Sequence, residues 1–274
     1  MKAQTNLRPF FWVIFIAIAV VSCKSGTKNS TKTSDQGIES LVSREKVIEE
    51  VTGYPIPTSF EVTTMINDAG SPFIIGLVNS TENIDKYFSI KEKAVNLGIY
   101  SADLSYVATY IQKQKTMYYL ETSKRLIDEL EITSAFNRDY IQRVESNIDN
   151  RDSLIHIISE SFYDTYKYLR KNEQDITSVL VVSGSWIESI YITSQIIIVS
   201  HDKQPYIDIL VKQKKSLDQL LDVVEPVKDD ENIRDIYSGL VGIKNAYEEI
   251  GDKATTKQID DLTKKLETLR DGLI

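Results

Sequence analysis

The fold is decided by residues 99–183, which read IYSADLSYVATYIQKQKTMYYLETSKRLIDELEITSAFNRDYIQRVESNIDNRDSLIHIISESFYDTYKYLRKNEQDITSVLVVS. These 85 residues contain neither glycine nor proline, although average usage would supply about ten. A β-protein of this length needs many tight turns, for which glycine and proline are the usual residues, whereas long helices need few. The stretch therefore predicts an all-α protein.

Apolar spacing and stop signals divide the chain around this stretch into helices. We expect long helices over 84–111, 113–131, 137–147 and 152–171. Upstream, a helix over 38–52 should stop at Gly53 and the prolines that follow it, and a helix over 58–69 should stop at Gly70. Most of the chain, 38–274, is thus predicted to be a multi-helix antiparallel bundle.

Residues 176–199 are the most apolar part of the chain beyond the N-terminus, with 14 apolar residues among 24. Glu188, Gln195 and seven serines or threonines interrupt the run. A helix that is apolar on all sides is either surrounded by other helices or spans a membrane. The polar interruptions favour a buried central helix over a membrane span.

The C-terminal part shows three seams at helical spacing. They run through Tyr206 to Val224, Ile233 to Ile250 and Ile259 to Leu273, with Gln213 at one position of the first seam. Three helices with matching seams should pack antiparallel. A three-helix subdomain from about residue 203 is therefore possible within the bundle.

The N-terminus reads as an export signal. Lys2 and Arg8 are the only charges before residue 24, and a run of twelve apolar residues follows from Phe10 to Val21. As a helix, such a run reaches about 18 Å, short of the roughly 30 Å of bilayer hydrocarbon. We therefore expect 1–22 to be a cleaved signal peptide.

Val20-Val21-Ser22-Cys23 resembles the lipobox of bacterial lipoprotein precursors, although an ordinary secretory signal with a chance cysteine is the alternative. The resemblance implies cleavage before Cys23 and attachment of acyl chains such as palmitate to it, and several chains anchor a protein stably. Lys24 stands where lipoproteins of the inner membrane often have Asp, so an outer-membrane anchor facing the periplasm is expected. Residues 23–37 would form the acylated cysteine and a flexible tether. Residues 100–110 and 147–186 faintly resemble uncharacterised helical lipoproteins of diderm bacteria, a likeness that implies no activity.

The composition excludes several classes of function. Thirty-two cations against 40 anions give a net charge of −8, which argues against a nucleic-acid partner. The single cysteine cannot form an internal disulfide. No phosphate-binding loop, nucleophile elbow or zinc motif occurs. Asp152, His156 and Glu160 share a helix face but spread over about 12 Å, too far to bind one ion together, although two of them could contribute to a site that another helix completes. We expect no enzymatic activity, cofactor or metal.

Two acids lie in apolar surroundings, Asp103 and Glu188. A buried acid needs a partner and is a candidate site residue. Tyr100, Tyr106 and Tyr166 could line a ligand pocket with them, but we favour the interpretation that the tyrosines lie at the core boundary with their hydroxyls in water. Gly98, between Ala94 and Ala102, and Gly184 read as places where helix backbones come close.

Two functions remain. The first is a lipid-anchored, non-enzymatic module of the envelope with a binding, adaptor or structural role toward a protein or envelope partner. The alternative is a bundle that binds or senses a small ligand through Asp103, Glu188 and the tyrosines.

Overall fold

The structure of the protein, a computed structural model, describes residues 59–133, 139–250 and 254–274. Within these residues the regular elements are ten α-helices and two 3-10 helices, without β-strands. The all-α prediction is thus confirmed. The predictions for the signal peptide (1–22), for Cys23 and the tether (23–37) and for a helix over 38–52 lie outside the described residues.

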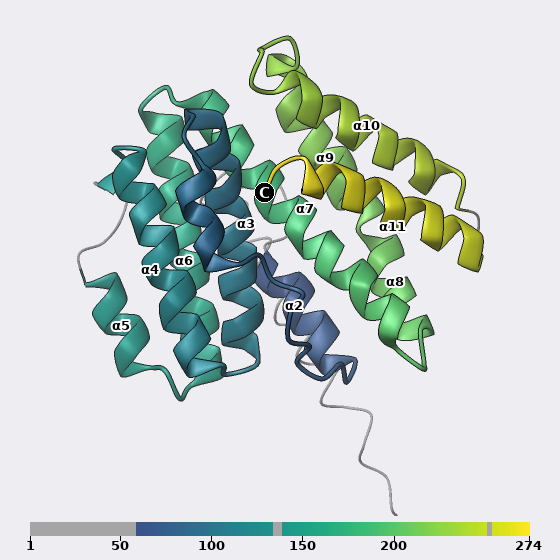
Figure 1. Cartoon of the computed structure of the whole chain (residues 1–274), viewed down its shortest axis with the longest axis horizontal. Coiled ribbons are helices and arrows are strands. Elements are labelled where there is room, and N and C mark those ends of the chain that lie inside the picture. Colours follow the sequence, from purple (N-terminus) through teal and green to yellow (C-terminus); the bar gives the residue numbers. More distant parts are fainter. Residues whose placement is uncertain (1–58, 134–138, 251–253) are drawn as a thin grey trace, which may run out of the picture.

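The elements follow one another along the chain with short connections. The first half contains α2 (Ser59–Asp68), η1 (Thr81–Lys86), α3 (Ile90–Thr109), α4 (Lys113–Glu129), α5 (Tyr140–Ser146) and α6 (Arg151–Lys171). The second half contains α7 (Asp175–Val199), α8 (Gln204–Lys212), α9 (Lys214–Val224), η3 (Glu225–Val227), α10 (Arg234–Glu248) and α11 (Thr256–Asp271). Figure 1 shows α4, α5 and α6 on one side of α3, and α8 to α11 on the other side of the molecule.

The centre of the fold is the pair α3 and α7, whose backbones come into contact at two glycines. A Cβ built on Gly98 would lie 2.0 Å from the carbonyl oxygen of Val181, and one built on Gly184 would lie 2.0 Å from that of Val95. Only glycine allows so close an approach. The predicted close approach at these glycines is confirmed.

The last helix closes the bundle over this central pair. The side-chain amide of Gln195 on α7 donates to Glu267 on α11 at 2.7 Å. Arg270, one turn after Glu267, donates to Glu188, about two turns before Gln195. Rising numbers in one helix thus match falling numbers in the other, so α11 runs antiparallel to α7. Because α11 contacts α7 as well as α10, its inner face reaches the main core.

Three turns within the glycine-free stretch use residues other than glycine in the left-handed conformation. Ile111 has φ 53°, Glu131 φ 60° and Glu173 φ 57°. At each turn, paired backbone hydrogen bonds close a Schellman motif, as when Gln112 N–H donates to Val107 and Ile111 N–H to Ala108. The chain therefore ends three helices in tight turns without the residue that usually permits them.

The predicted helix over 84–111 is wrong at its start. Residues 81–86 form η1, and α3 begins only at Ile90. Ser89 caps α3: its hydroxyl accepts from Glu92 N–H at 3.1 Å, and the Glu92 carboxylate accepts from Ser89 N–H at 2.8 Å. This capping box fixes the start of the helix, and its Ser-x-x-Glu pattern can be recognised in the sequence.

The predicted continuous helix over the 206–224 seam is also wrong. α8 ends at Lys212 and α9 begins at Lys214, with Gln213 buried at the junction. The hydroxyl of Ser216 donates to the carbonyl oxygen of Gln213 at 2.8 Å, and the indole of Trp186 donates to that hydroxyl at 3.2 Å. The polar residue in the seam is thus accommodated by a break in the helix, where a buried hydrogen-bond network satisfies it.

α7 is the buried central helix that its composition predicts. It is long and apolar enough to cross a membrane, yet 83% of its most apolar window is buried inside the molecule. It contacts α2, α3, α6, α8, α9 and α11. Packing on all sides accounts for an apolar surface all around the helix.

Candidate functional site

Glu188 lies at the centre of the described core and forms an ion pair with Arg270. Glu188 is 0% exposed and Arg270 5%. The guanidinium donates to both carboxylate oxygens, from Nε at 2.5 Å and from Nη2 at 2.8 Å. It also stacks over the ring of Tyr191 at 4.0 Å from the centroid. This bidentate geometry is the strong form of a carboxylate–arginine contact.

Asp103 lies beside this pair and is also 0% exposed. Its Oδ2 accepts from the backbone N–H of Asn79 at 3.1 Å, whereas its Oδ1 has no donor among the described residues. Burial and the neighbouring Glu188 carboxylate raise the pKa of Asp103 well above its usual 3.8, and Arg270 offsets this only in part. This environment therefore favours the protonated form of Asp103, which could donate its proton to Glu188.

The charges of the cluster balance only with that proton. Burial lowers the pKa of Arg270, but the charge and hydrogen bonds of Glu188 outweigh this, so the net pKa is raised and the guanidinium stays charged. One cation then matches one carboxylate, and the second acid is neutral. Such a cluster can hold three helices together, because Asp103 is on α3, Glu188 on α7 and Arg270 on α11.

Tyr100 and Tyr106 both form hydrogen bonds with the backbone inside the protein. The hydroxyl of Tyr100 donates to Ser80 O at 2.8 Å, and that of Tyr106 accepts from Ile74 N–H at 2.9 Å. Both residues are 0% exposed, so the preferred interpretation, with hydroxyls in water, is wrong for them. Burial raises the pKa of Tyr106 to about 12. These two hydrogen bonds hold the segment 74–80 against α3.

Tyr166 is not part of this cluster. It lies on α6 and is buried, and burial raises its pKa. The structure therefore brings Asp103 and Glu188 together, surrounds them with tyrosines that include Tyr100, and leaves Tyr166 in another part of the core.

Sequence reasoning missed Arg270 and Asn79. The side-chain amide of Asn79 donates to the Tyr87 hydroxyl at 3.0 Å, and the backbone carbonyl oxygen of Asn79 accepts from the Tyr119 hydroxyl at 2.6 Å. For Arg270 a signal existed: it lies four residues after Leu266, on the face that α11 turns inward. Asn79 lies in a connection without periodicity, so no pattern pointed to it.

The described residues contain no group of three or more His, Cys, Asp or Glu side chains that could hold a metal ion. Of the helix face considered above, Asp152 and His156 are exposed, and Glu160 accepts from Arg143 at 2.6 Å. This face is therefore solvated and partly paired.

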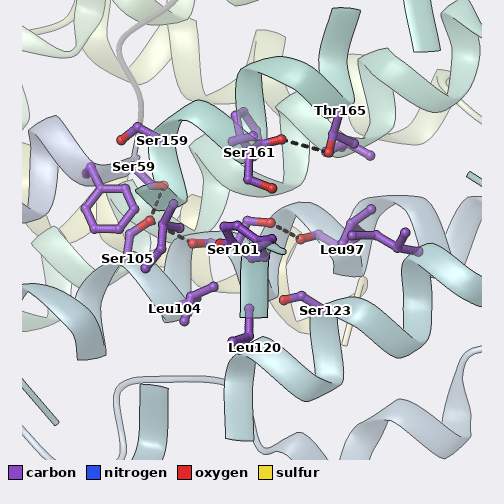
Figure 2. Close-up of a pocket in the computed structure, with 16 residues that line it drawn as sticks. Ser59, Leu97, Ser101, Leu104, Ser105, Leu120, Ser123, Ser159, Ser161 and Thr165 are labelled. Carbon is purple, nitrogen blue, oxygen red and sulfur yellow. Dashed lines mark hydrogen bonds between the residues drawn. The ribbon is translucent and has the colours of Figure 1, made fainter. Parts of the chain in front are cut away.

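Two hollows lie elsewhere. An internal cavity of about 30 Å³ is bounded mainly by α3, α4 and α6 (Figure 2). An open groove of about 770 Å³ runs between α10 and α11. Neither is lined by Asp103, Glu188, Tyr100, Tyr106 or Tyr166.

A scan against protein-family models finds no match. Searches of curated proteins and of solved structures likewise find no similar protein.

Proposed function

We propose that the protein is a lipoprotein anchored through Cys23 in the outer membrane, and that its helical domain serves a protein or envelope partner in the periplasm without catalysing a reaction. The observation that carries the proposal is the position of the only cysteine, directly after the apolar run and Val20-Val21-Ser22. A cysteine at this place is what acylation requires.

The geometry of the buried acids supports a non-enzymatic role. Asp103 and Glu188 are the kind of paired carboxyls that perform acid–base chemistry. Here both are fully enclosed, and Glu188 is held by two hydrogen bonds from Arg270. A substrate would have to displace α11 to reach them, whereas their cross-linking of three helices needs no access at all.

The groove between α10 and α11 is a surface that such a module could offer to a partner. Gly242 leaves its floor open, since a Cβ built there meets no atom within 4 Å. Lys264 and Lys265 line it together with Asp235 and Asp261, so it offers charges of both signs. Mixed charge at a rim is typical of protein-binding surfaces.

The anchor is tested by growing cells with labelled palmitate. We expect label in the wild-type protein and in the control Ser25→Ala, and none in Cys23→Ser, because only the cysteine sulfur accepts the first acyl chain. Wild-type protein should remain with outer-membrane fractions. Label that persists in Cys23→Ser, or wild-type protein that is released without detergent, would overturn the anchor.

The partner surface is tested by affinity purification from envelopes with Gly242→Trp, which places a large side chain in the groove at a position where an added Cβ meets no atom within 4 Å. The control is Glu121→Trp, which also introduces a tryptophan but on the exposed face of α4. Loss of a co-purifying protein or cell-wall component in Gly242→Trp alone is the expected result. Equal recovery with both variants would place any partner surface elsewhere.

A second candidate function is the binding of a small ligand. Asp103, Glu188, Tyr100 and Tyr106 are enclosed and hold one another or the backbone, which disfavours them as its site. The internal cavity offers this function a different place.

A further inference from the structure

The internal cavity has a lining without charge. Sixteen residues border it, eight of them apolar and eight with a hydroxyl group. The apolar walls come from Leu97 and Leu104 of α3, Leu120 and Ile127 of α4 and other large side chains. No acidic, basic or histidine side chain is among them, so a charged molecule would lose its hydration without a counter-charge. Whatever binds there is uncharged.

Four of the eight hydroxyl groups around the cavity already use their hydrogens within the protein. Ser101 donates to Leu97 O at 2.6 Å, Ser105 to Ser101 O at 2.8 Å and Thr165 to Ser161 O at 2.9 Å (Figure 2). The hydroxyl of Ser59 lies 2.9 Å from that of Ser105. These groups keep lone pairs toward the cavity but have no hydrogen to give.

Ser123 is different. Its side chain lines the cavity and is 5% exposed, yet its Oγ has no hydrogen-bond partner among the described residues (Figure 2). A buried hydroxyl without a partner is unfavourable by about 1–3 kcal/mol. Ser123 therefore offers the cavity a buried free donor, on the wall formed by α4.

We propose that this cavity binds a small uncharged molecule with an apolar body and one hydroxyl or carbonyl oxygen, which accepts a hydrogen bond from Ser123. The volume of about 30 Å³ exceeds the roughly 10–15 Å³ that one water molecule needs, so the ligand is limited to a few heavy atoms. A short-chain alcohol has this size and chemistry. The half-buried Ser159, Ser161 and Phe162 of α6 mark the side from which it enters.

This inference goes beyond the anchored module and does not depend on it. It gives the second candidate function a site that shares no residue with the buried acids. Acylation of Cys23 and occupancy of the cavity are measured separately, so either proposal can fail while the other stands.

The test is a titration of the full chain, methyl-labelled for NMR, with 1-propanol as the probe. We expect saturable shifts of the Leu120 and Ile127 methyl signals, while those of Leu262 and Leu266 on α11 stay in place. Ser123→Ala should weaken binding about two- to tenfold, the effect of one hydrogen bond. Because it removes an unsatisfied hydroxyl, this variant should fold as the wild type does.

Ser183→Ala is the matched control. Ser183 on α7 also has a fully buried hydroxyl without a partner among the described residues, but it does not line the cavity. It should leave the affinity for 1-propanol within twofold of wild type, and Ser101→Leu, which fills the cavity, should abolish the shifts. Absence of saturation in the wild type, as for a cavity that takes only water, or equal effects of Ser123→Ala and Ser183→Ala, would overturn the proposal.

Discussion

Asp103, Glu188 and Arg270 are ionisable side chains in a core where charge is expensive. Desolvation of an ion pair can offset its attraction, so the pair is not a strong source of stability by itself. Removing one partner has a much larger effect, because it leaves an uncompensated charge. The cluster therefore makes the position of α11 highly specific: Arg270 has a matched partner only when it reaches Glu188.

Arg270→Met tests this specificity. It leaves two buried carboxyls without a cation, and we expect the free energy of unfolding to fall by about 3–5 kcal/mol. Urea denaturation measures the change. Lys264→Met, on the exposed side of the same helix, should change it by less than about 0.5 kcal/mol. Adding Glu188→Gln to Arg270→Met should recover part of the loss, and a double variant no more stable than Arg270→Met would contradict this account.

Asp103 makes stability depend on pH. Because its pKa is raised in the folded state, the folded protein binds more protons than the unfolded chain between pH 3.8 and the raised pKa. Its contribution to stability is therefore fully present below pH 3.8 and is lost as the pH rises through this window.

Asp103→Asn removes the titration and can still donate to Glu188. The variant should gain stability relative to the wild type as the pH rises from 4 to 8. Chemical denaturation of both proteins at each pH gives the difference. A difference that stays constant with pH, or shrinks, would show that Asp103 is ionised in the folded protein.

The sequence indicated two of the three ionisable side chains in this cluster. Asp103 and Glu188 were recognisable because each interrupts an apolar run. Arg270 was not, because an arginine in the last turn of an otherwise polar helix normally reads as a surface residue. Its position four residues after Leu266 places it on the inner face of α11, but the partner that it meets there depends on where α11 docks.

The crossing of α3 and α7 depends on two glycines, Gly98 and Gly184, which carry no side chain. Gly184→Ala would place a methyl group 2.0 Å from the carbonyl oxygen of Val95, and neither backbone can move away without disturbing the core. We expect a loss of about 1–3 kcal/mol or more, seen as a lower midpoint of thermal unfolding. Gly242→Ala meets no atom within 4 Å and should instead stabilise α10 by about 0.5–1 kcal/mol. Equal shifts for the two variants would contradict the close crossing.

Helix boundaries were predictable where the apolar period and a stop signal coincide. The start of α6 and the end of α7 agree with the prediction to within a residue, and Gly70 ends α2 in the left-handed conformation as expected. The prediction failed at the start of α3 and at Gln213, where side-chain hydrogen bonds rather than apolar spacing decide the backbone. Predicting helix boundaries therefore requires capping residues, and polar residues within an apolar seam, to be considered together with the apolar period.

The arrangement of the helices was less predictable than their existence. Some sequence neighbours contact each other, as α3 does with α4 and α10 with α11. The most extensive contact, between α3 and α7, joins helices separated by three others along the chain. The closure of the core by α11 brings together residues 82 positions apart. Both depend on complementarity between surfaces that are distant in sequence, which local periodicity does not encode.

The burial of α7 decides between two views of the whole protein, a bundle built around its most apolar helix or a chain that places this helix in a membrane. In a bundle, the α7 amides exchange hydrogen only when the whole domain unfolds. We therefore expect the full chain with Cys23→Ser to show its slowest hydrogen exchange in 179–197 without detergent or lipid. The short helix α5, which contacts mainly α6, should exchange much faster and serves as the internal comparison. Fast exchange in α7 that slows only when lipid vesicles are added would contradict burial, because the partners that protect it would then be acyl chains rather than α3 and α11.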